Sequence, residues 1–354
     1  MKKKTYINGL GCISTQKTFD TVFLEEAVYN QNDTILSIVP PVYKDFISPV
    51  AARRMAKGVK NGIVASALAL KDAQIENVDA IITGTGLGCI EDSEKFLKNI
   101  LDNNEEFLTP TSFIQSTHNT VGAQIALTLQ CKGYNFTYVN GAVSFESALL
   151  DAKMQIEEDE ANSVLVGGID ETGDYTISLF KLEGRIKKES DKPFDLLNTN
   201  SNGVVYGEGA SFFVLENEKK TTTYAEIIDV EIINTLDENE VEAAIISFLK
   251  SNNLQISDLD AVVLGFDGNL AFESYYKNLT ENAFAKTPQL YYKHLSGEYD
   301  TASAFGLWMA SKVIKTQETS EIIKVNSVEK PTYNTILLYN QMNGKNHSFT
   351  LLSK

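Results

Sequence analysis

The chain has few of the residues that build metal centres and disulfide frameworks. Among its 354 residues are three cysteines and three histidines, and no Cys-x-x-Cys or Cys/His spacing of the kind typical of a zinc site. The cysteines, Cys12, Cys89 and Cys131, lie far apart in apolar or glycine-rich stretches. We therefore expect no disulfide framework and no metal site, and we expect no cofactor.

Long apolar runs and positive charge are also scarce. No run approaches the ~18 apolar residues of a membrane span, and the net charge of −16 repels nucleic acids and anionic membranes. The opening residues, MKKKTYINGLGCIS, are typical of a strand and turn and not of a signal peptide. We expect a cytoplasmic protein with no nucleic-acid or membrane partner. An acidic carrier protein would need a basic patch, for which the candidates are Arg53, Arg54, Lys57 and Lys60.

Apolar content is high enough for a large core, at 43% of the residues. Strand-like runs alternate along the chain with helical stretches, and the runs are continuously apolar, which is typical of strands buried on both faces. The sequence therefore predicts a layered α/β architecture. The predicted strands lie at 78–86, 162–170, 210–216, 259–268 and 333–341.

A weak internal repeat indicates a duplicated fold. The segment at 67–86 is echoed at 246–268, and GEGASFFVLE at 207–216 aligns without a gap onto GKNHSFTLLS at 344–353. Two matching pairs in the same order favour two homologous halves. The join falls in the Lys/Thr-rich stretch near 216–224. We predict halves at residues 1–220 and 221–354.

Residues 137–152 read TYVNGAVSFESALLDA, which predicts a strand, a small-residue elbow and then a helix. Enzymes often mount a nucleophile on such an elbow, where the helix N-terminus stabilises an anion. The tip of this elbow holds Val143, whose isopropyl group has no nucleophilic atom. The neighbouring Ser144 is the alternative nucleophile.

Several motifs, taken in order, resemble the β-ketoacyl-acyl-carrier-protein synthase family of the thiolase fold. The resemblance implies two duplicated βαβαβ-type halves in a five-layered α-β-α-β-α arrangement. One further stretch, SFIQSTHNTVGAQIAL, is similar to the ketosynthases of aryl-polyene and flexirubin pathways. The motifs are YINGLGCIS, RRMAKGVKNGIVASALAL, GTGLGCIEDSEKFL, VNGAVSFESAL, LVGGIDE, KPFDLLNTNSNGVVYGEGASFFVLE and the C-terminal GKN.

The residues that carry condensation chemistry in this family are replaced here. The resemblance implies a cysteine where Val143 stands. It also implies two oxyanion-stabilising histidines, at Asp267 (or, one place away, Phe266) and at Glu298. Carboxylates repel the negative charge that neutral imidazoles would stabilise. Of the usual set only Lys293 remains.

The three histidines of the chain do not obviously replace the missing ones. His294 lies just before the second of these loops, where a loop shift would bring it into the site, although an exposed or capping role is the simpler interpretation. His118 lies in a turn-like stretch whose neighbours suit helix capping, and His347 falls in the final strand pair.

A ketosynthase-like chain without this cysteine resembles the chain-length factor. That protein is a silent ketosynthase-like subunit that pairs with an active ketosynthase and meets the acyl carrier protein through the complex. Its tunnel or gate elements would be Val143, Phe145, Phe113 and Met342, where the family usually has phenylalanine at the last position. Ordinary core packing is an equal alternative for each. Two other functions stay open: an acyltransferase or condensing enzyme that uses Ser144, and a stand-alone protein that binds acyl chains or carrier protein.

Overall fold

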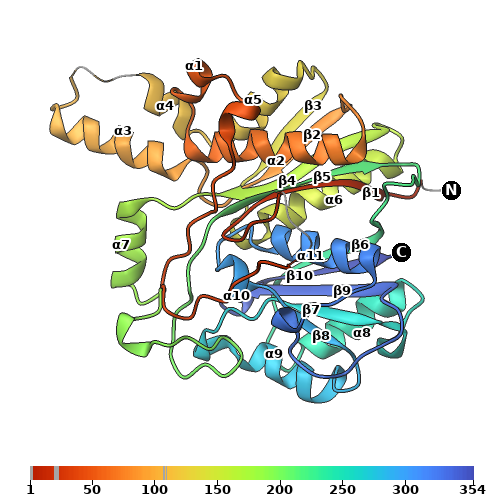
Figure 1. Ribbon diagram of the computed structural model, residues 1–354. Helices are drawn as coiled ribbons and strands as arrows, with labels where there is room; N and C mark the ends of the chain where they lie inside the picture. Colours follow the sequence, from red (N-terminus) through yellow and green to blue (C-terminus); the bar gives the residue numbers. More distant parts are fainter. Residues whose placement is uncertain (1–2, 20–23, 107, 109) are drawn as a thin grey trace.

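The computed structural model describes residues 3–19, 24–106, 108 and 110–354. Within these residues the strands form one continuous ladder in the order β3-β2-β4-β5-β1-β6-β10-β9-β7-β8 (Figure 1). The strands are β1 (Tyr6–Ile13), β2 (Ala80–Gly84), β3 (Tyr134–Tyr138), β4 (Ser163–Asp170), β5 (Gly209–Glu216), β6 (Ala225–Thr235), β7 (Ala261–Leu264), β8 (Gln289–Tyr291), β9 (Thr335–Met342) and β10 (Lys345–Ser353).

The pairing pattern of β1 to β5 is repeated by β6 to β10. In the first set β2 runs parallel to β3 and β4, and β5 lies antiparallel between β4 and β1. In the second set β7 runs parallel to β8 and β9, and β10 lies antiparallel between β9 and β6. The sets join where Tyr6 and Ile7 of β1 pair with Glu226 and Ala225 of β6. The predicted duplication is therefore confirmed, while the boundary at residue 220, between β5 and β6, stays a prediction.

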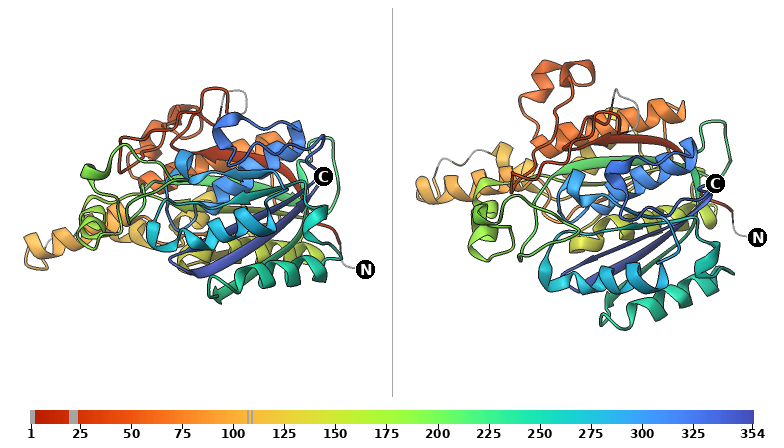
Figure 2. Two further views of the ribbon diagram at one scale, coloured as in Figure 1. Left: turned by 90° about the horizontal axis from the view of Figure 1, so that it is seen from below. Right: turned by 60° about the horizontal axis from the view of Figure 1, so that its bottom comes forward.

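Helices cover both sets of strands, so that the molecule has five layers (Figures 1 and 2). Helices α2 (Lys57–Ala73) and α5 (Thr120–Leu129) cover the outer face of the first set. Helices α6 (Ser144–Glu157) and α11 (Ser303–Thr316) pack between the two sets. Helices α8 (Val241–Ser251) and α9 (Ser274–Asn278) cover the outer face of the second set.

The continuously apolar strands are explained by this layering, because successive side chains point to opposite faces of a strand. Phe212 of β5 packs under α2, whereas Phe213 faces the central helices. In the second half, Leu351 and Leu352 of β10 divide in the same way between the outer and central layers. Strands that are buried on both faces therefore need apolar residues at every position.

The glycines of YINGLG let α2 lie directly against β1. A Cβ atom at Gly9 would stand 2.2 Å from the carbonyl oxygen of Ala69, and one at Gly11 would stand 1.9 Å from that of Ala65. Both distances are far below van der Waals contact, so a larger side chain would push the helix off the sheet.

The remaining α-helices are α1 (Pro49–Ala52), α3 (Ile90–Asp102), α4 (Pro110–Ser116), α7 (Asp174–Leu182) and the short α10 (Lys293–Ser296), whose four residues are all buried. Helices α3, α4 and α7 project together from one side of the molecule (Figure 1). Among the described residues, no helix has both the length and the apolar character needed to span a membrane.

Candidate functional site

The elbow of residues 139–144 connects the edge strand β3 to helix α6. Gly141 has φ +53°, a left-handed conformation that glycine adopts without steric cost. Residues Gly141–Val143 form a short 3₁₀ turn, and α6 begins at Ser144. Val143 and Ser144 are both fully buried. The elbow therefore has the expected shape, with an apolar side chain enclosed at its tip.

The hydroxyl of Ser144 holds the elbow together. Its Oγ donates to the carbonyl oxygen of Gly141 at 2.7 Å and accepts from the amide of Asn140 at 2.7 Å. Both partners are backbone groups of the same turn, so the hydroxyl proton is directed to a carbonyl oxygen and not to a general base. This geometry favours a structural role for Ser144, because nucleophilic serine needs a base within hydrogen-bond reach.

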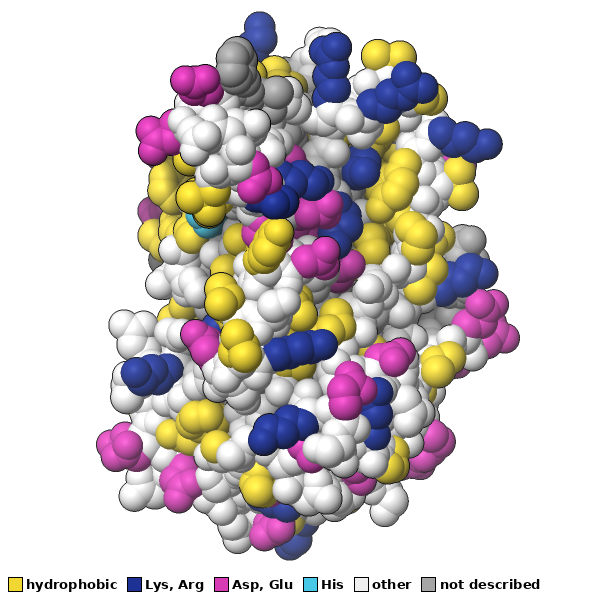
Figure 3. Space-filling view, turned by 90° about the vertical axis from the view of Figure 1, so that its left-hand side faces the viewer, with side chains coloured by type: hydrophobic (Ala, Val, Ile, Leu, Met, Phe, Trp, Pro, Cys, Tyr) yellow, Lys and Arg dark blue, Asp and Glu magenta, His cyan; other side chains and the backbone are white. Residues whose placement is uncertain are grey.

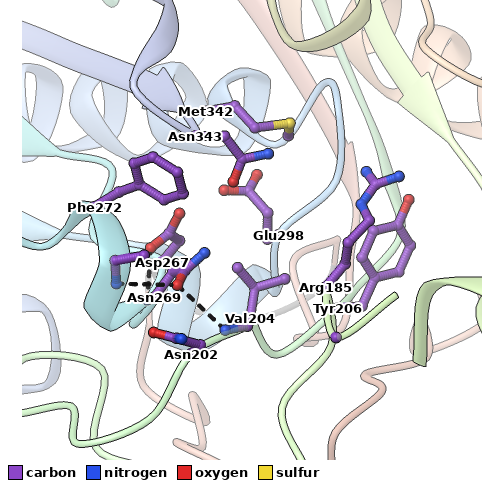
Figure 4. A pocket seen from close by; sticks show the side chains of 13 residues that line it. Arg185, Asn202, Val204, Tyr206, Asp267, Asn269, Phe272, Glu298, Met342 and Asn343 are labelled. Atoms are coloured by element: carbon purple, nitrogen blue, oxygen red, sulfur yellow. Dashed lines mark hydrogen bonds between the residues drawn. The ribbon is translucent and has the colours of Figure 1, made fainter. Parts of the chain in front are cut away.

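A cavity of about 230 Å³ opens where segments of the two halves meet (Figure 4). Its apolar lining comes mainly from Val204, Phe272 and Met342, and its acidic lining from Asp267 and Glu298. The volume lies below the ~300 to 1,000 Å³ of drug-sized ligand pockets, so only a small group fits. The other lining residues are Gly184, Arg185, Asn202, Gly203, Tyr206, Asn269, Ala271 and Asn343.

Glu298 forms a buried ion pair behind the cavity wall. The Nζ atom of Lys293 donates to Glu298 Oε2 at 2.5 Å, and the two side chains are 0% and 5% exposed. Burial raises the pKa of Glu298 to about 7, and the ammonium of Lys293 opposes this shift. The charge of Lys293 is therefore paired with the carboxylate of Glu298, at the position where the family resemblance implies a histidine.

Asp267 lies nearby, and only one of its two carboxylate oxygens accepts a hydrogen bond. Its Oδ1 accepts from the amide of Asn269 at 2.8 Å, whereas Oδ2 is buried and has no hydrogen-bond partner. Burial raises the pKa of Asp267, although the positive charges of Lys293 and Lys187 partly counter it. An uncompensated oxygen of this kind is costly to bury unless a donor reaches it.

Lys187 is buried close to Asp267 but bonds to other groups. Its Nζ donates to the carbonyl oxygen of Gly268 at 2.7 Å, and to the side chain of Thr199 and both oxygens of Ser201 at 3.1 to 3.2 Å. Burial lowers the pKa of Lys187, against the pull of the Asp267 charge. The ammonium thus fixes the 199–201 and 268 loops together.

Of the two candidates for the first histidine position, Asp267 and Phe266, only Asp267 lies at the cavity. The ring of Phe266 instead packs 4.7 Å from that of Tyr276 in the outer layer of the second half. Glu298 and Met342 also line the cavity, and Lys293 contacts it through Glu298.

The other predicted residues do not line the cavity. Val143 and Ser144 are absent from its walls. Phe145 is 1% exposed, and its ring lies 5.6 Å from that of Phe213 in the central layer. Phe113 is 54% exposed on α4, where its ring packs 5.2 Å from that of Phe96. Only Met342 of the four predicted tunnel residues is thus at the cavity, and the tunnel assignment stays a prediction.

The exposed or capping role expected for His294 is wrong. Its ring is 1% exposed and stacks 3.7 Å from Tyr291, with the ring of Tyr29 5.0 Å away. Burial lowers the pKa of His294 to about 3, so the imidazole is held neutral among aromatic rings. It does not line the cavity.

The other two histidines also lie away from the cavity. His118 is exposed beside Gly88, and the residue before α5, Asn119, makes no side-chain capping bond. His347 is buried, with its Nδ1 3.1 Å from the hydroxyl of Tyr339.

The basic residues considered for carrier-protein docking are only partly available. Lys57 forms an ion pair with the buried Glu208 at 2.8 Å, and Lys60 lies 5.6 Å from the centre of the Tyr43 ring. Arg53 and Arg54 are exposed at the end of α1. Within the described residues, no group of His, Cys, Asp and Glu side chains is arranged to hold a metal ion.

Sequence reasoning missed several polar residues of the cavity, and they share a recognisable origin. Asn202 and Asn269 lie in asparagine- and glycine-containing loops, NTNSNG and FDGN. Asn269 Oδ1 accepts from the amides of Gly203 and Ala271, at 3.2 and 3.3 Å, which joins loops from the two halves (Figure 4). Such loops are a signal for turns, and nothing local indicates that the two meet.

Solved structures share this fold over nearly the whole chain. The ishigamide ketosynthase/chain length factor gives a TM-score of 0.79 at 17% identity and covers 100% of both chains. A β-ketoacyl synthase from Burkholderia phymatum STM815 gives 0.81 at 16%, covering 99% of each. The complex of ketosynthase ApeO with its chain length factor ApeC from Xenorhabdus doucetiae gives 0.77 at 12%, covering 99% of this chain and 98% of the other. These similarities show the thiolase-like fold.

Sequence comparison adds the family. The chain is 25% identical over 202 residues to 3-oxoacyl-[acyl-carrier-protein] synthase 2 of Staphylococcus aureus strain N315, which covers 52% of this chain and 48% of that enzyme. The chain thus matches about half the length of its curated relatives. Residues 42–221 match the family model "Beta-ketoacyl synthase, N-terminal domain". Since that match spans half of the chain and the fold agrees, the chain belongs to the β-ketoacyl synthase family.

Proposed function

We propose that this chain is a catalytically silent, chain-length-factor-like subunit that pairs with an active β-ketoacyl synthase. It would help to shape the partner's acyl tunnel in polyketide, aryl-polyene or fatty acid biosynthesis and would meet the acyl carrier protein through the complex. The observation that carries the proposal is the fully buried Val143 at the tip of the elbow, where the family chemistry needs a thiolate.

The electrostatics of the cavity support this proposal. Condensation builds negative charge on a carbonyl oxygen, which hydrogen-bond donors must stabilise. The cavity instead presents the carboxyl groups of Asp267 and Glu298, and Lys293 is already bonded to Glu298. A negative charge that develops beside them would be repelled. A substitution at the elbow alone would therefore leave the second requirement unmet.

The free edge of β3 supports a pairing role. Among the described strands β3 pairs only with β2, so its outer edge is open for a further strand. Tyr134 and Phe136 on this strand are 42% and 46% exposed. Val139, Leu127 of α5 and Met154 of α6 add exposed apolar surface. Aromatic and apolar surface on an open sheet edge is typical of a protein interface.

Exposed apolar residues on helices α3 and α4 also support a pairing role for this chain. Phe113 and Ile114 are exposed on α4, and Leu97 and Leu101 are exposed on α3. Hydrophobic side chains gather in the upper part of the side of the molecule from which these helices project (Figure 3). A partner that covers this surface would bury Phe113, which is one of the predicted tunnel elements.

The test is coexpression with a ketosynthase of the same organism that carries the cysteine and both histidines, chosen from genes next to this one where they encode such an enzyme. We expect a one-to-one complex by size-exclusion chromatography with light scattering. Phe136→Glu should abolish it, because the charge would be buried at the strand edge. The matched control is Ile246→Glu on α8, which is likewise 46% exposed, lies on the outer face of the second half and should leave the complex intact. A stable monomer that binds no ketosynthase would support the stand-alone binding function instead.

A second measurement separates the silent subunit from an acyltransferase. The purified chain is incubated with an acyl thioester and examined by peptide mass spectrometry over residues 139–147. We expect no covalent adduct, since the Ser144 hydroxyl bonds to the backbone of its own turn. Acylation of Ser144 would support the enzymatic alternative and overturn the proposal.

A further inference from the structure

Glu171 caps two helices that begin without capping residues of their own. Neither Ala56 before α2 nor Cys89 before α3 has a side-chain oxygen that could bond the first amides of its helix, and such amides need an acceptor. The carboxyl group of Glu171 supplies one to each helix. It accepts from the amide of Gly58 in α2 and, at 3.0 Å, from the amide of Glu91 in α3. One side chain, 1% exposed, therefore joins the starts of both helices.

Polar contacts also connect the projecting helices α3, α4 and α7 to one another and to α2. Glu94 of α3 accepts from the amides of Tyr175 and Thr176 at the start of α7, at 3.2 and 2.7 Å. Gln115 of α4 accepts from the amide of Ala56 at 3.2 Å. Every residue of α3 and α7 is at least partly exposed. Segments that share little buried apolar surface with a core open at a lower free-energy cost than the core itself.

We propose that Glu171 is a clamp that holds the projecting helices α3, α4 and α7 on the layered core (Figure 1), and that its release lets them open together while the core stays folded. Release would separate the start of α3 from that of α2. Cys89 lies at this junction, where it is 1% exposed, and a Cβ atom at Gly58 would stand 3.5 Å from its Sγ. Opening would therefore expose a thiol that the closed form protects. The clamp does not depend on whether the chain pairs with a ketosynthase.

The clamp should respond to pH. Burial raises the pKa of Glu171 to about 7, which outweighs the bonds from the two helix amides. Opening would let water reach the carboxyl group and return its pKa to 4.5, so the closed form binds this proton more tightly. The clamp is therefore tightest below pH 4.5, and opening becomes easier as the pH rises to about 7, by up to about tenfold per pH unit. The titratable groups that interact with Glu171 are Lys57 of α2, Glu91 and Lys95 of α3, and the thiol of Cys89.

Alkylation of Cys89 measures the opening. The full chain is treated with N-ethylmaleimide at about pH 6.5, where the closed form still holds most of the Glu171 proton, and peptide mass spectrometry follows each cysteine. Glu171→Ala should make Cys89 react at least about tenfold faster, because the loss of two bonds to buried amides accounts for about this factor. Cys12, 2% exposed inside the core, should react no faster than in the wild type. An unchanged Cys89 rate, or equal acceleration of Cys12, would overturn the proposal.

Glu94→Ala is the matched control, because it removes the same kind of cap from α7 and leaves both Glu171 bonds in place. It should leave the Cys89 rate unchanged, and a faster rate would refute the assignment of the clamp to Glu171. Should Glu171→Ala not fold, hydrogen exchange of the unaltered chain decides. After correction for intrinsic exchange, protection of the α3 amides should fall between about pH 5 and about pH 7, while the β5 amides stay protected. Protection of α3 that does not change with pH would contradict the proposal.

Discussion

Lys293 and Glu298 form an ion pair of 2.5 Å with both side chains out of contact with solvent. The pair crosses from α10 to the segment that forms a bridge with Tyr206, and backbone bonds from Glu298 to Val205 and Gly207 flank it. Removing two charges from water costs about as much as their attraction returns. The pair therefore fixes the local geometry more than it adds net stability.

This balance predicts the behaviour of single and double variants. Lys293→Met should lower the free energy of unfolding by about 3 to 5 kcal/mol, because it leaves the buried Glu298 carboxylate unpaired. The double variant Lys293→Met/Glu298→Gln should recover most of that loss. Denaturant unfolding of the wild type, both single variants and the double variant measures the coupling. A double variant whose loss equals the sum of the single losses would contradict the account.

Stability should also depend on pH through Glu298. Burial raises its pKa from 4.5 to about 7, so the folded state holds this proton more tightly than the unfolded state. The resulting stabilisation is fully present below pH 4.5 and is lost as the pH rises through about 7. Between these values Glu298→Gln should make the decline of unfolding free energy with pH shallower, by up to about 1.4 kcal/mol per pH unit.

Other buried carboxyl groups set the background for that measurement. Burial raises the pKa of Glu171 and of Asp300 to about 7, and it also raises the pKa of Asp267, Glu146 and Asp170. The Glu298→Gln variant should therefore keep part of the slope. The exposed Glu318→Gln variant serves as the control and should reproduce the wild-type curve. Identical slopes for Glu298→Gln and the wild type would show that Glu298 does not titrate in this range.

Val143→Cys should not create a condensing enzyme. The new thiol would sit at the start of α6, but Asp267 and Glu298 would still replace hydrogen-bond donors at the cavity. We expect the activity of the reconstituted heterodimer to stay within about twofold of wild type, because the oxyanion support that contributes ~10²-fold or more is missing. The measurement is product formation at matched complex concentration, and a second active site in the variant would refute the mechanism.

Bulky substitutions at Phe113 and Phe145 should have different effects. Phe145→Trp adds volume to a packed layer and should cost about 1 to 3 kcal/mol of stability without a change in product length. Phe113 is exposed on α4, so Phe113→Trp should leave stability nearly unchanged. Its effect would appear in the product-length distribution of the reconstituted pair, which should shift to shorter chains. An unchanged distribution would exclude Phe113 from the tunnel.

The sequence allowed the duplicated fold to be predicted because each repeat carries its own local pattern. Buried strands such as 210–216 need apolar residues on both faces, and glycines such as Gly9 mark close contact with a helix. The order of the motifs also implied that Asp267 and Glu298 belong to one site, and both line the cavity. These patterns can be recognised in the sequence alone, because every strand that is buried on both faces needs apolar residues along its whole length.

The rest of the site depends on distant contacts that no local pattern encodes. His294 was expected to be exposed or to cap a helix, yet Tyr29, which is far away in the chain, helps to bury it. Asn202 and Asn269 lie in loops that meet only after the two halves pack. The orphaned oxygen of Asp267 is a property of the assembled cavity, since it depends on where Lys187 and Lys293 find other partners.

The two copies of the duplicated fold contribute residues of different charge to the cavity walls. The first copy supplies Arg185, Asn202 and Tyr206, which carry positive or no charge, whereas the second supplies both Asp267 and Glu298. Two copies of one fold thus give a shared chamber walls of different charge, so a change of side chain in either copy alters the electrostatic field that the other copy faces.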